Sequence, residues 1–255
     1  MIAVDVGNTK TAFALFRNDV LVRQSQVETD IRRTTNDYRN LINEFLRPVG
    51  ISLKATEQIT AASVVPAITE QLKPLAKDVD VHFVSHESPI SFEIALADPR
   101  SLGADRIANM EGAVRKYGAP VIVVDVGTAI SVSVLNRRKQ FLGGALAPGV
   151  GISLDALFSS TALIRRGALD RPKRAIGSTT LEAIGSGIHF GYAAMVDGLV
   201  SKMKEDLGEK EVAVVGKGGT IDMLAPYIDP HFQLYPTLTL EGLRFIYENL
   251  RSQHG

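Results

Sequence analysis

Short apolar runs and longer amphipathic stretches alternate along the whole of this chain. Apolar runs bounded by polar turn residues predict β-strands, whereas apolar residues at every third or fourth position predict helices. The predicted strands are Ile2–Val4, Thr11–Phe16, Val20–Val22, Gln58–Val65, Val79–Val84, Val121–Val124, Ile130–Leu135, Gln140–Leu142, Glu211–Val215 and Phe232–Tyr235. The predicted helices are Asn36–Leu46, Ala67–Ala76, Ala104–Tyr117, Ile152–Phe158, Thr180–Leu207 and Leu240–Leu250. This order of elements predicts an α/β protein.

An internal repeat divides the chain. Val4–Thr9 reads VDVGNT, and about half a chain later Val124–Ala129 reads VDVGTA. Each copy begins with an apolar strand, passes through Asp-Val-Gly, and continues into a second apolar strand, a polar turn and a third strand. Both halves are therefore predicted to open with the same β-hairpin. We expect two lobes, residues 1–118 and 119–255, with Lys116–Pro120 as the passage between them.

The repeated loop has the chemistry of a phosphate-binding turn. Gly7 and Gly127 let the backbone come close to a ligand, and the amides and hydroxyls that follow can donate hydrogen bonds to phosphate oxygens. Asp5 and Asp125 supply carboxylates, which are suitable ligands for Mg²⁺. A single Asp-x-Gly is most often only a turn that ends a strand, but its repetition at half-chain spacing favours a functional role.

Composition narrows the possible roles. Lys plus Arg and Asp plus Glu both number 28, so no general attraction to nucleic acid or to acidic membranes is expected. The chain has no cysteine, which removes disulfides, thiolate metal sites and cysteine nucleophiles. The amino-terminal segment lacks a basic region followed by a long apolar run, and no apolar stretch is long enough to span a bilayer. A cytoplasmic protein is expected.

Seven motifs in order resemble the type III pantothenate kinases. They are DVGNT at Asp5–Thr9, ASVVP at Ala62–Pro66, LGADRIAN at Leu102–Asn109, DVGTA at Asp125–Ala129, GGALAPG at Gly143–Gly149, IGSTTLEAI at Ile176–Ile184 and LTLEGLRFIYE at Leu238–Glu248. The resemblance implies two duplicated ribonuclease-H-like lobes of the actin-like ATPase fold, with the nucleotide in the cleft between them. It also implies ATP-dependent phosphorylation of pantothenate to 4′-phosphopantothenate, the first step of coenzyme A biosynthesis.

The resemblance further implies the site residues. For binding of the ATP phosphates it indicates Asp5, Gly7, Asn8 and Thr9 of the first loop and Asp125, Gly127 and Thr128 of the second. A glycine turn near the nucleoside is expected at Gly218 and Gly219. Mg²⁺ is expected at Asp5 and Asp125, together with a monovalent cation, K⁺ or NH₄⁺.

The pantothenate site is implied in the same way. Asp105 is the expected base or orienting group for the substrate hydroxyl, and Gly103 and Arg106 are expected to contact the substrate. Thr180 is expected to reach pantothenate across the interface of a homodimer. The residue types agree with these roles, since a guanidinium matches a planar carboxylate. Asp105 and Arg106 can also be interpreted as a charge pair that stabilises the start of a helix.

The chain departs from the family pattern at several positions. Ser133 stands where a further aspartate is common, and Lys217 replaces the first residue of the usual T-G-G. Leu96 and Asp98 stand where tyrosine and asparagine are common upstream of the GADR motif. Two alternatives therefore remain open. One is a kinase of another small hydroxy acid or sugar, and the other is a nucleotide-binding regulator of the same fold with weak catalytic activity.

Overall fold

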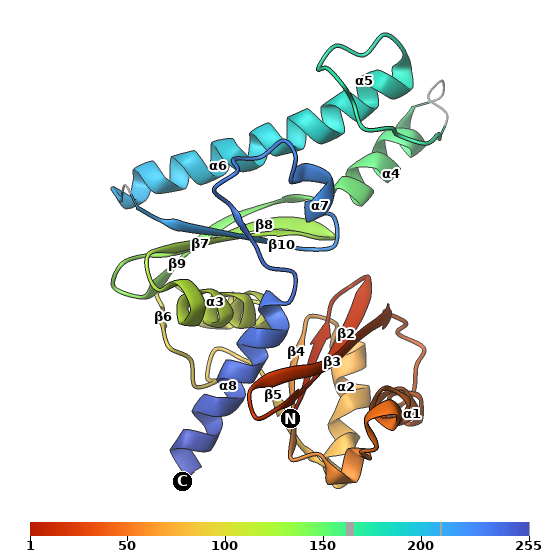
Figure 1. The fold of residues 1–255 in the computed structure, drawn as a ribbon, viewed down its shortest axis with the longest axis vertical. Coiled ribbons are helices and arrows are strands. Elements are labelled where there is room, and N and C mark those ends of the chain that lie inside the picture. The colour runs from red at the N-terminus through yellow and green to blue at the C-terminus, as the bar shows by residue number, and fades with distance from the viewer. Residues whose placement is uncertain (162–165, 210, 255) are drawn as a thin grey trace. The chain divides into compact units, whose positions relative to one another are not determined.

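The computed structural model describes residues 1–161, 166–209 and 211–254. The chain forms two compact units, one made of residues 1–116 and 237–255 and the other of residues 117–236 (Figure 1). The predicted division after residue 118 lies close to the first boundary, but it placed the last helix in the second lobe. In the structure the chain returns, and that helix packs in the first unit.

The first unit contains a five-stranded sheet in the order β3-β2-β1-β4-β5. Its strands are β1 (Ile2–Val6), β2 (Lys10–Arg17), β3 (Val20–Glu28), β4 (Gln58–Ser63) and β5 (Asp80–Phe83), and a short strand β6 (Glu93–Ile94) follows. The helices are α1 (Thr35–Leu46), α2 (Pro66–Leu72), α3 (Ala104–Tyr117) and α8 (Leu238–His254). Short 3₁₀ turns occupy Arg47–Val49, Leu53–Ala55, Lys73–Lys77 and Pro99–Ser101.

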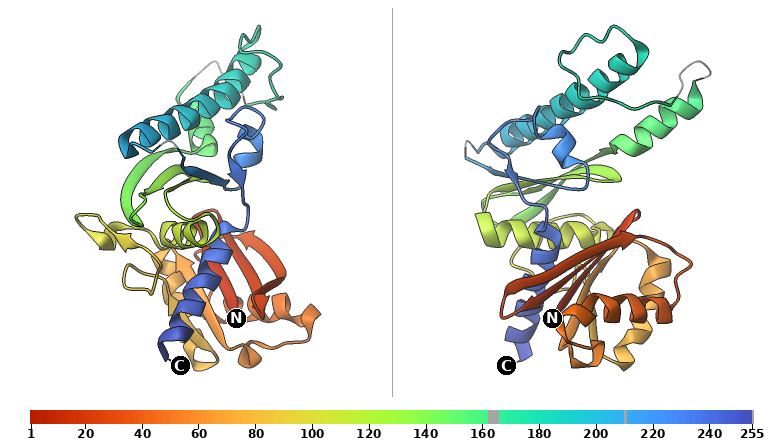
Figure 2. Two further views of the ribbon diagram at one scale, coloured as in Figure 1. Left: turned by 60° about the vertical axis from the view of Figure 1, so that its left-hand side comes forward. Right: turned by 45° about the vertical axis from the view of Figure 1, so that its right-hand side comes forward.

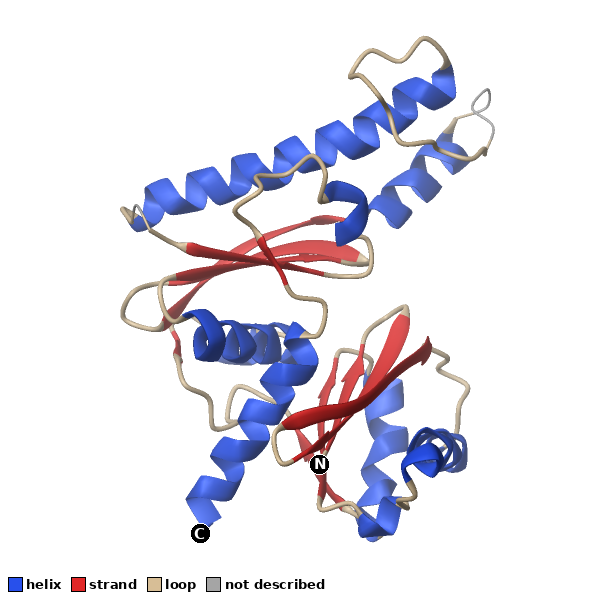
Figure 3. Cartoon of the chain, viewed as in Figure 1, coloured by secondary structure: helices blue, strands red, loops and turns tan. Residues whose placement is uncertain are grey.

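The second unit repeats this arrangement, with strands in the order β11-β10-β7-β8-β9 (Figure 3). Its strands are β7 (Val121–Val126), β8 (Ala129–Leu135), β9 (Gln140–Pro148), β10 (Ala213–Lys217) and β11 (Gln233–Leu234). The helices are α4 (Val150–Ser160), α5 (Thr180–Ser186), α6 (Tyr192–Leu207) and α7 (Ile221–Leu224), with a π-helical turn at Gly187–Gly191. No helix in the described ranges is both long enough and apolar enough to cross a membrane.

The two sheets have the same topology. In each, the first strand pairs antiparallel with the second and the second pairs antiparallel with the third. The first strand also pairs in parallel with the fourth, which pairs in parallel with the fifth. The prediction that both halves open with the same hairpin is confirmed. The sequence repeat is therefore a duplication of a whole folding unit.

Each unit has its own apolar core on one face of its sheet. In the first unit, β1, β2 and β4 pack against α1 and α2, with Tyr38, Phe13 and Ile59 among the buried side chains. In the second unit, β7 and β8 pack against α6 and α7. Because side chains alternate along a strand, Asp5 and Asp125 lie on the faces opposite these cores, one residue along from buried valines.

Helices α3 and α8 pack backbone against backbone, which explains why the last helix belongs to the first unit. A Cβ atom at Gly112 would lie 2.6 Å from the Leu238 carbonyl oxygen, and one at Gly242 would lie 1.8 Å from that of Ala108. The fully buried carboxylate of Glu111 fastens the contact. It accepts hydrogen bonds from the Ser91 amide and hydroxyl, both at 2.7 Å, and from the Asn249 side chain.

Several elements differ from the sequence prediction. Strand β9 continues through a glycine-rich segment that was not predicted to be extended. Gly144 lies directly against β8, where a Cβ would stand 1.7 Å from the Val132 carbonyl oxygen, so glycine permits the pairing. The predicted helix Thr180–Leu207 is interrupted by the π-helical turn that separates α5 from α6. The short β6 and α7 were not predicted, because two to four residues carry little periodic signal.

Because α3 and α8 pack so closely, replacing a glycine inside this contact and replacing one outside it should change the free energy of unfolding in opposite directions. Gly242→Ala should lower the free energy of unfolding by about 1–3 kcal/mol, because the added methyl group overpacks the contact. Gly198→Ala on α6, where nothing lies within 4 Å of the added atom, should raise it by up to about 1 kcal/mol through helix propensity alone. Urea denaturation of both variants measures the difference. Equal effects of the two substitutions would contradict the close-packed contact.

Candidate active site

The first predicted phosphate loop, Gly7–Thr9, follows directly after β1. The Gly7 amide donates to the Lys10 carbonyl oxygen at 3.0 Å, and a Cβ at Gly7 would lie only 3.2 Å from that oxygen. Asn8 and Thr9 are exposed at the tip of the loop, and Asp5 is half-buried on the strand. The polar atoms of this loop are therefore presented at the carboxyl end of β1.

Thr29 anchors this loop, a role that the sequence analysis missed. Its hydroxyl donates to the Gly7 carbonyl oxygen at 2.7 Å, and its amide donates to the Thr9 carbonyl oxygen at 2.9 Å. Because the Thr29 proton is used in this way, the buried Thr11 hydroxyl donates to Thr29 Oγ1 at 3.0 Å. No sequence signal marked this role, because Thr29 directly follows β3 only as the structure has it, whereas the predicted strand ended at Val22.

Asp105 lies in the first turn of α3, and its carboxylate folds back over Gly103. Asp105 Oδ1 accepts a hydrogen bond from the Arg106 amide at 2.8 Å. A Cβ at Gly103 would stand 2.6 Å from the same oxygen, so a side chain at 103 would displace the carboxylate. This geometry agrees with the charge-stabilised helix start considered from the sequence, and it also fixes the direction of the carboxylate.

The Gly103–Asp105 turn and the first loop lie at the same edge of the first sheet. Strands β1 and β4 are parallel, and the Val64 amide donates to the Val6 carbonyl oxygen at 3.1 Å just beyond their ends. The Cβ position of Gly103 is 3.7 Å from the Val64 side chain. The first unit thus brings a predicted phosphate loop and the predicted base to the carboxyl ends of two adjacent parallel strands, the position where α/β folds bind ligands.

Arg106 adds a half-buried positive charge beside Asp105. Burial lowers the pKa of the Arg106 guanidinium, and the neighbouring Asp105 opposes this effect. Arginine keeps its proton in proteins, so the guanidinium remains a cation. A partly desolvated cation of this shape is suited to bind a carboxylate.

The second loop, Gly127–Thr128, is held by close backbone contacts, and the Thr220 hydroxyl donates to the Val126 carbonyl oxygen directly before it at 2.9 Å. The Gly149 amide donates to the Thr128 carbonyl oxygen at 3.0 Å, and a Cβ at Gly149 would stand 2.3 Å from the Gly127 carbonyl oxygen. Gly218 adopts φ +113°, and its Cβ position is 2.4 Å from the Val126 carbonyl oxygen. Only glycine is compatible with these two close approaches.

Asp125 forms an ion pair with a lysine. Lys217 Nζ lies 3.1 Å from Asp125 Oδ2, and the two side chains are 11% and 18% exposed. The two residues stand side by side in register at the ends of the parallel strands β10 and β7. At the corresponding place in the first sheet, the neighbour of Asp5 on β4 is Ala62. The surroundings of the two aspartates therefore differ, and metal binding at Asp5 and Asp125 stays a prediction.

A cavity of about 640 Å³ opens in the second unit beside the Gly218–Gly219 turn. Gly219 is exposed, with nothing within 4 Å of its Cβ position. The residues that line the cavity include Gly219, Thr220, Met223, Ile188 and His189. The π-helical turn supplies the last two, and the Nδ1–H of His189 donates to the Gly185 carbonyl oxygen at 2.8 Å. The volume is in the range of small-molecule sites.

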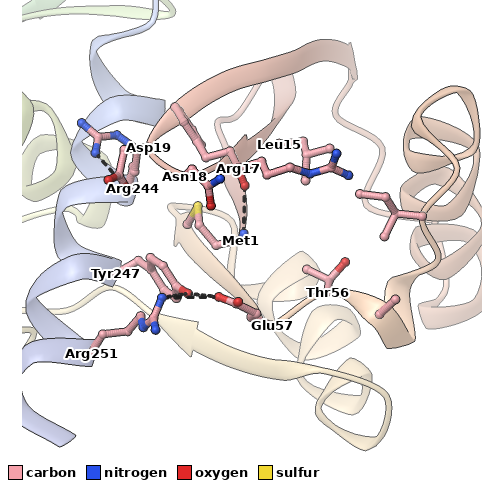
Figure 4. Close-up of a pocket in the computed structure, with 13 residues that line it drawn as sticks. Met1, Leu15, Arg17, Asn18, Asp19, Thr56, Glu57, Arg244, Tyr247 and Arg251 are labelled. Carbon is pink, nitrogen blue, oxygen red and sulfur yellow. Dashed lines mark hydrogen bonds and ion pairs between the residues drawn. The ribbon is translucent and has the colours of Figure 1, made fainter. Parts of the chain in front are cut away.

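A second cavity, of about 460 Å³, lies in the first unit beside Met1 and the β2–β3 turn (Figure 4). It is therefore at the opposite end of β1 from Gly7. Its charged side chains contact one another. Glu57 accepts a short hydrogen bond from the Tyr247 hydroxyl, and Arg244 lies 3.6 Å from Asp19. These contacts stabilise the hairpin and α8, and none of the predicted site residues lines this cavity.

The structure therefore groups the predicted residues by unit. Asp5, Gly7, Asn8, Thr9, Gly103, Asp105 and Arg106 belong to one edge of the first sheet, whereas Asp125, Gly127, Thr128, Gly218 and Gly219 belong to the second unit. Thr180 is the exposed first residue of α5. Among the described residues, no three His, Cys, Asp or Glu side chains gather closely enough to hold a metal ion.

Comparison with known proteins assigns the family. The family model of type III pantothenate kinase matches residues 1–202. The type III pantothenate kinase of Moorella thermoacetica is 36% identical over 255 residues, covering 97% of this chain and 98% of the relative. The chain belongs to the type III pantothenate kinase family.

Solved structures extend the comparison to the fold of this family member. The activator of 2-hydroxyisocaproyl-CoA dehydratase from Clostridium difficile, with bound ADPNP, superposes with a TM-score of 0.59 at 12% identity, covering 99% of this chain and 96% of that one. The ROK hexokinase from Thermus thermophilus superposes with a TM-score of 0.54 at 14% identity, covering 100% of this chain and 99% of the hexokinase chain. The predicted actin-like ATPase fold of duplicated ribonuclease-H-like lobes is confirmed.

The anchor of the first loop gives a direct prediction. Thr29→Val should cost about 1 kcal/mol of unfolding free energy, because it removes a donor to the Gly7 carbonyl, and it should weaken ATP binding by freeing the loop. Thr29→Ser keeps the hydroxyl and should remain close to the native protein in both respects. Urea denaturation and ATP titration calorimetry measure these effects. Native ATP affinity in Thr29→Val would show that the loop needs no such anchor.

Proposed function

We propose that this protein catalyses transfer of the γ-phosphoryl group of ATP to the hydroxyl of pantothenate, giving 4′-phosphopantothenate for coenzyme A biosynthesis. The observation that carries this proposal is the edge of the first sheet, where the Gly7–Thr9 loop and Asp105 lie at the ends of adjacent parallel strands. Phosphoryl transfer depends on positioning and electrostatic stabilisation, which such an edge can supply. Membership of the type III pantothenate kinase family supports this substrate.

In the proposed reaction Asp105 orients the pantothenate hydroxyl and accepts its proton as the oxygen attacks the γ-phosphorus and ADP leaves. The contact with Gly103 and the hydrogen bond from the Arg106 amide fix the carboxylate for this role. Arg106 binds the pantothenate carboxylate through its guanidinium. The same guanidinium favours the ionised form of Asp105, as a base requires.

Both loops serve ATP in this proposal. The backbone amides and side chains of Asn8 and Thr9 donate to phosphate oxygens, as do those of Gly127 and Thr128 in the second unit. The nucleoside takes the cavity beside Gly218 and Gly219, where a base can approach the backbone closely. The apolar Met223 and Ile188 of that cavity suit a flat ring.

Mg²⁺ fits this site at Asp5. A half-buried carboxylate at a strand end, next to the exposed polar residues of the loop, offers the oxygen ligands that Mg²⁺ takes together with water and phosphate. When bound, the ion would neutralise charge on the phosphates. Asp125 is paired with Lys217 and fits this role less well.

We also propose that the protein acts as a homodimer through the second unit. Among the described residues of this unit, six large apolar side chains are exposed: Leu142, Leu146, Ile152, Ile176, Leu181 and Leu234. Three of them lie on or next to α4 and α5, which are at the same end of the unit (Figures 1 and 2). Exposed apolar surface of this kind is typical of a protein interface. Thr180, exposed at the start of α5, would then be presented to the partner.

Asp105→Asn tests the assignment of the base. Turnover of ATP and pantothenate should fall by roughly 10²–10⁴-fold, because the amide cannot accept the hydroxyl proton, while ATP affinity stays within a few-fold. A coupled assay of ADP formation with and without pantothenate measures turnover. Asp80→Asn, an exposed aspartate on β5 of the same sheet, is the matched control and should retain activity. Native turnover in Asp105→Asn would exclude Asp105 as the base.

Ile176→Asp tests the proposed dimer. The native protein should elute with twice the mass of the 27.5 kDa chain, and the variant should elute as a monomer, because an aspartate would bury a charge in the interface. Val20→Asp places the same charge on an exposed valine of the first unit and should stay dimeric. Light scattering during size-exclusion chromatography gives the masses. A monomeric native protein, or a dimeric Ile176→Asp, would contradict the proposed interface.

A further inference from the structure

Lys217 and Asp125 form an ion pair beside the second loop, where both side chains are largely withdrawn from water. The pair is built into the sheet, because the residues are register neighbours on parallel strands. The next residue, Gly218, presses against the backbone of Val126 directly before the loop. The Lys217 ammonium group therefore lies at the base of the second loop, and its position is fixed by the strand register and by the ion pair with Asp125.

This ammonium group changes which cations the second unit can bind. A metal or monovalent cation needs excess negative charge from its oxygen ligands, and like charges at short range repel strongly where water is excluded. Here one carboxylate already neutralises one ammonium at 3.1 Å. On the neighbouring strand β8, Ser131 is the register partner of Asp125, and Ser133, two residues further along and 3% exposed, stands where the family pattern commonly has an aspartate. The residues at this place do not fit a bound cation.

We propose that Lys217 is a built-in cation for the second loop, so that this protein needs neither K⁺ nor NH₄⁺ and binds no metal at Asp125. The proposal rests on the proposed binding of ATP by the second loop. The lysine compensates the charge of Asp125 at all times and holds the strand ends that carry the loop. It acts as a positioning residue, through Asp125 and the backbone that follows both strands.

Lys217→Thr tests the proposal, because it restores the residue of the family pattern and leaves the buried carboxylate without its ammonium. Kinase assays and thermal unfolding are run in choline chloride, NaCl, KCl or NH₄Cl at one ionic strength, which removes general screening as a variable. In the native protein, kcat/KM should differ by less than about twofold among these salts. In Lys217→Thr, kcat/KM in choline chloride should fall by about tenfold or more, and KCl or NH₄Cl should restore most of it.

Thermal unfolding supplies a readout that does not depend on catalysis. A cation that binds only the folded state raises the unfolding midpoint. KCl should therefore raise the midpoint of Lys217→Thr above its value in choline chloride, and it should leave the native midpoint unchanged. Lys202→Thr, which changes an exposed lysine on α6, is the matched control and should behave as the native protein does in every salt.

The outcomes separate this inference from the proposed function. A native protein that requires KCl, or a Lys217→Thr variant that matches Lys202→Thr or loses activity that no cation restores, would overturn the role of Lys217. If Lys217→Thr does not fold, the activity of the native protein with and without KCl still tests the proposal. Activity that requires KCl contradicts the role of Lys217 as a built-in cation, and activity that is independent of KCl supports it. If pantothenate is not phosphorylated at all, the proposed function fails, and the unfolding midpoints still decide the role of Lys217.

Discussion

The close approach of backbone to backbone at the ends of parallel strands is the constraint on which the rest of this structure depends. Loops that present amides and hydroxyls to a ligand must be held without bulky side chains, and the chain meets this requirement with glycine. Gly149 and Gly218 let two segments close on the second loop, and Gly103 leaves room for the Asp105 carboxylate. The same device, at Gly112 and Gly242, brings the final helix into the first unit and completes it.

The two units share a topology but differ in how each loop is held and how its aspartate is neutralised. Thr29 anchors the first loop through hydrogen bonds, whereas the second is held by close backbone contacts at Gly149 and Gly218 together with a hydrogen bond from the Thr220 hydroxyl. On the adjacent parallel strand, Asp5 has Ala62 beside it and Asp125 has Lys217. The ion pair with Lys217 fixes the position of the Asp125 carboxylate, and in the proposed function Asp5 is the aspartate that binds the metal ion. The proposal therefore gives the duplicated aspartates different roles.

Most of the fold followed from the sequence because its signals are local. The VDVG repeat marked both hairpins, and apolar runs marked the strands from Ile2 to Leu135 within a few residues, except that β3 runs on to Glu28 and β6 was not predicted. Two features could not be predicted locally. Strand β9 extends through Gly144 only because β8 lies against it, and α8 joins the first unit only because Gly112 accepts it there. In the site, Asp105 and the loops had motif signals, but Thr29 and the Lys217–Asp125 pair are contacts between distant segments that no local pattern encodes.

The distribution of charge also limits how the chemistry can be divided between the units. The proposed base and the aspartate beside an alanine both belong to the first unit, together with the half-buried Arg106. In the proposed reaction Asp105 accepts a proton and Asp5 binds Mg²⁺, so both roles belong to one edge of the first sheet. The second unit supplies a neutralised aspartate, a tightly clamped loop and the cavity beside Gly219, which suit recognition of the nucleotide more than reaction. Duplication thus provided two copies of one loop, and in the proposed function the Lys217–Asp125 pair distinguishes the role of the second from that of the first.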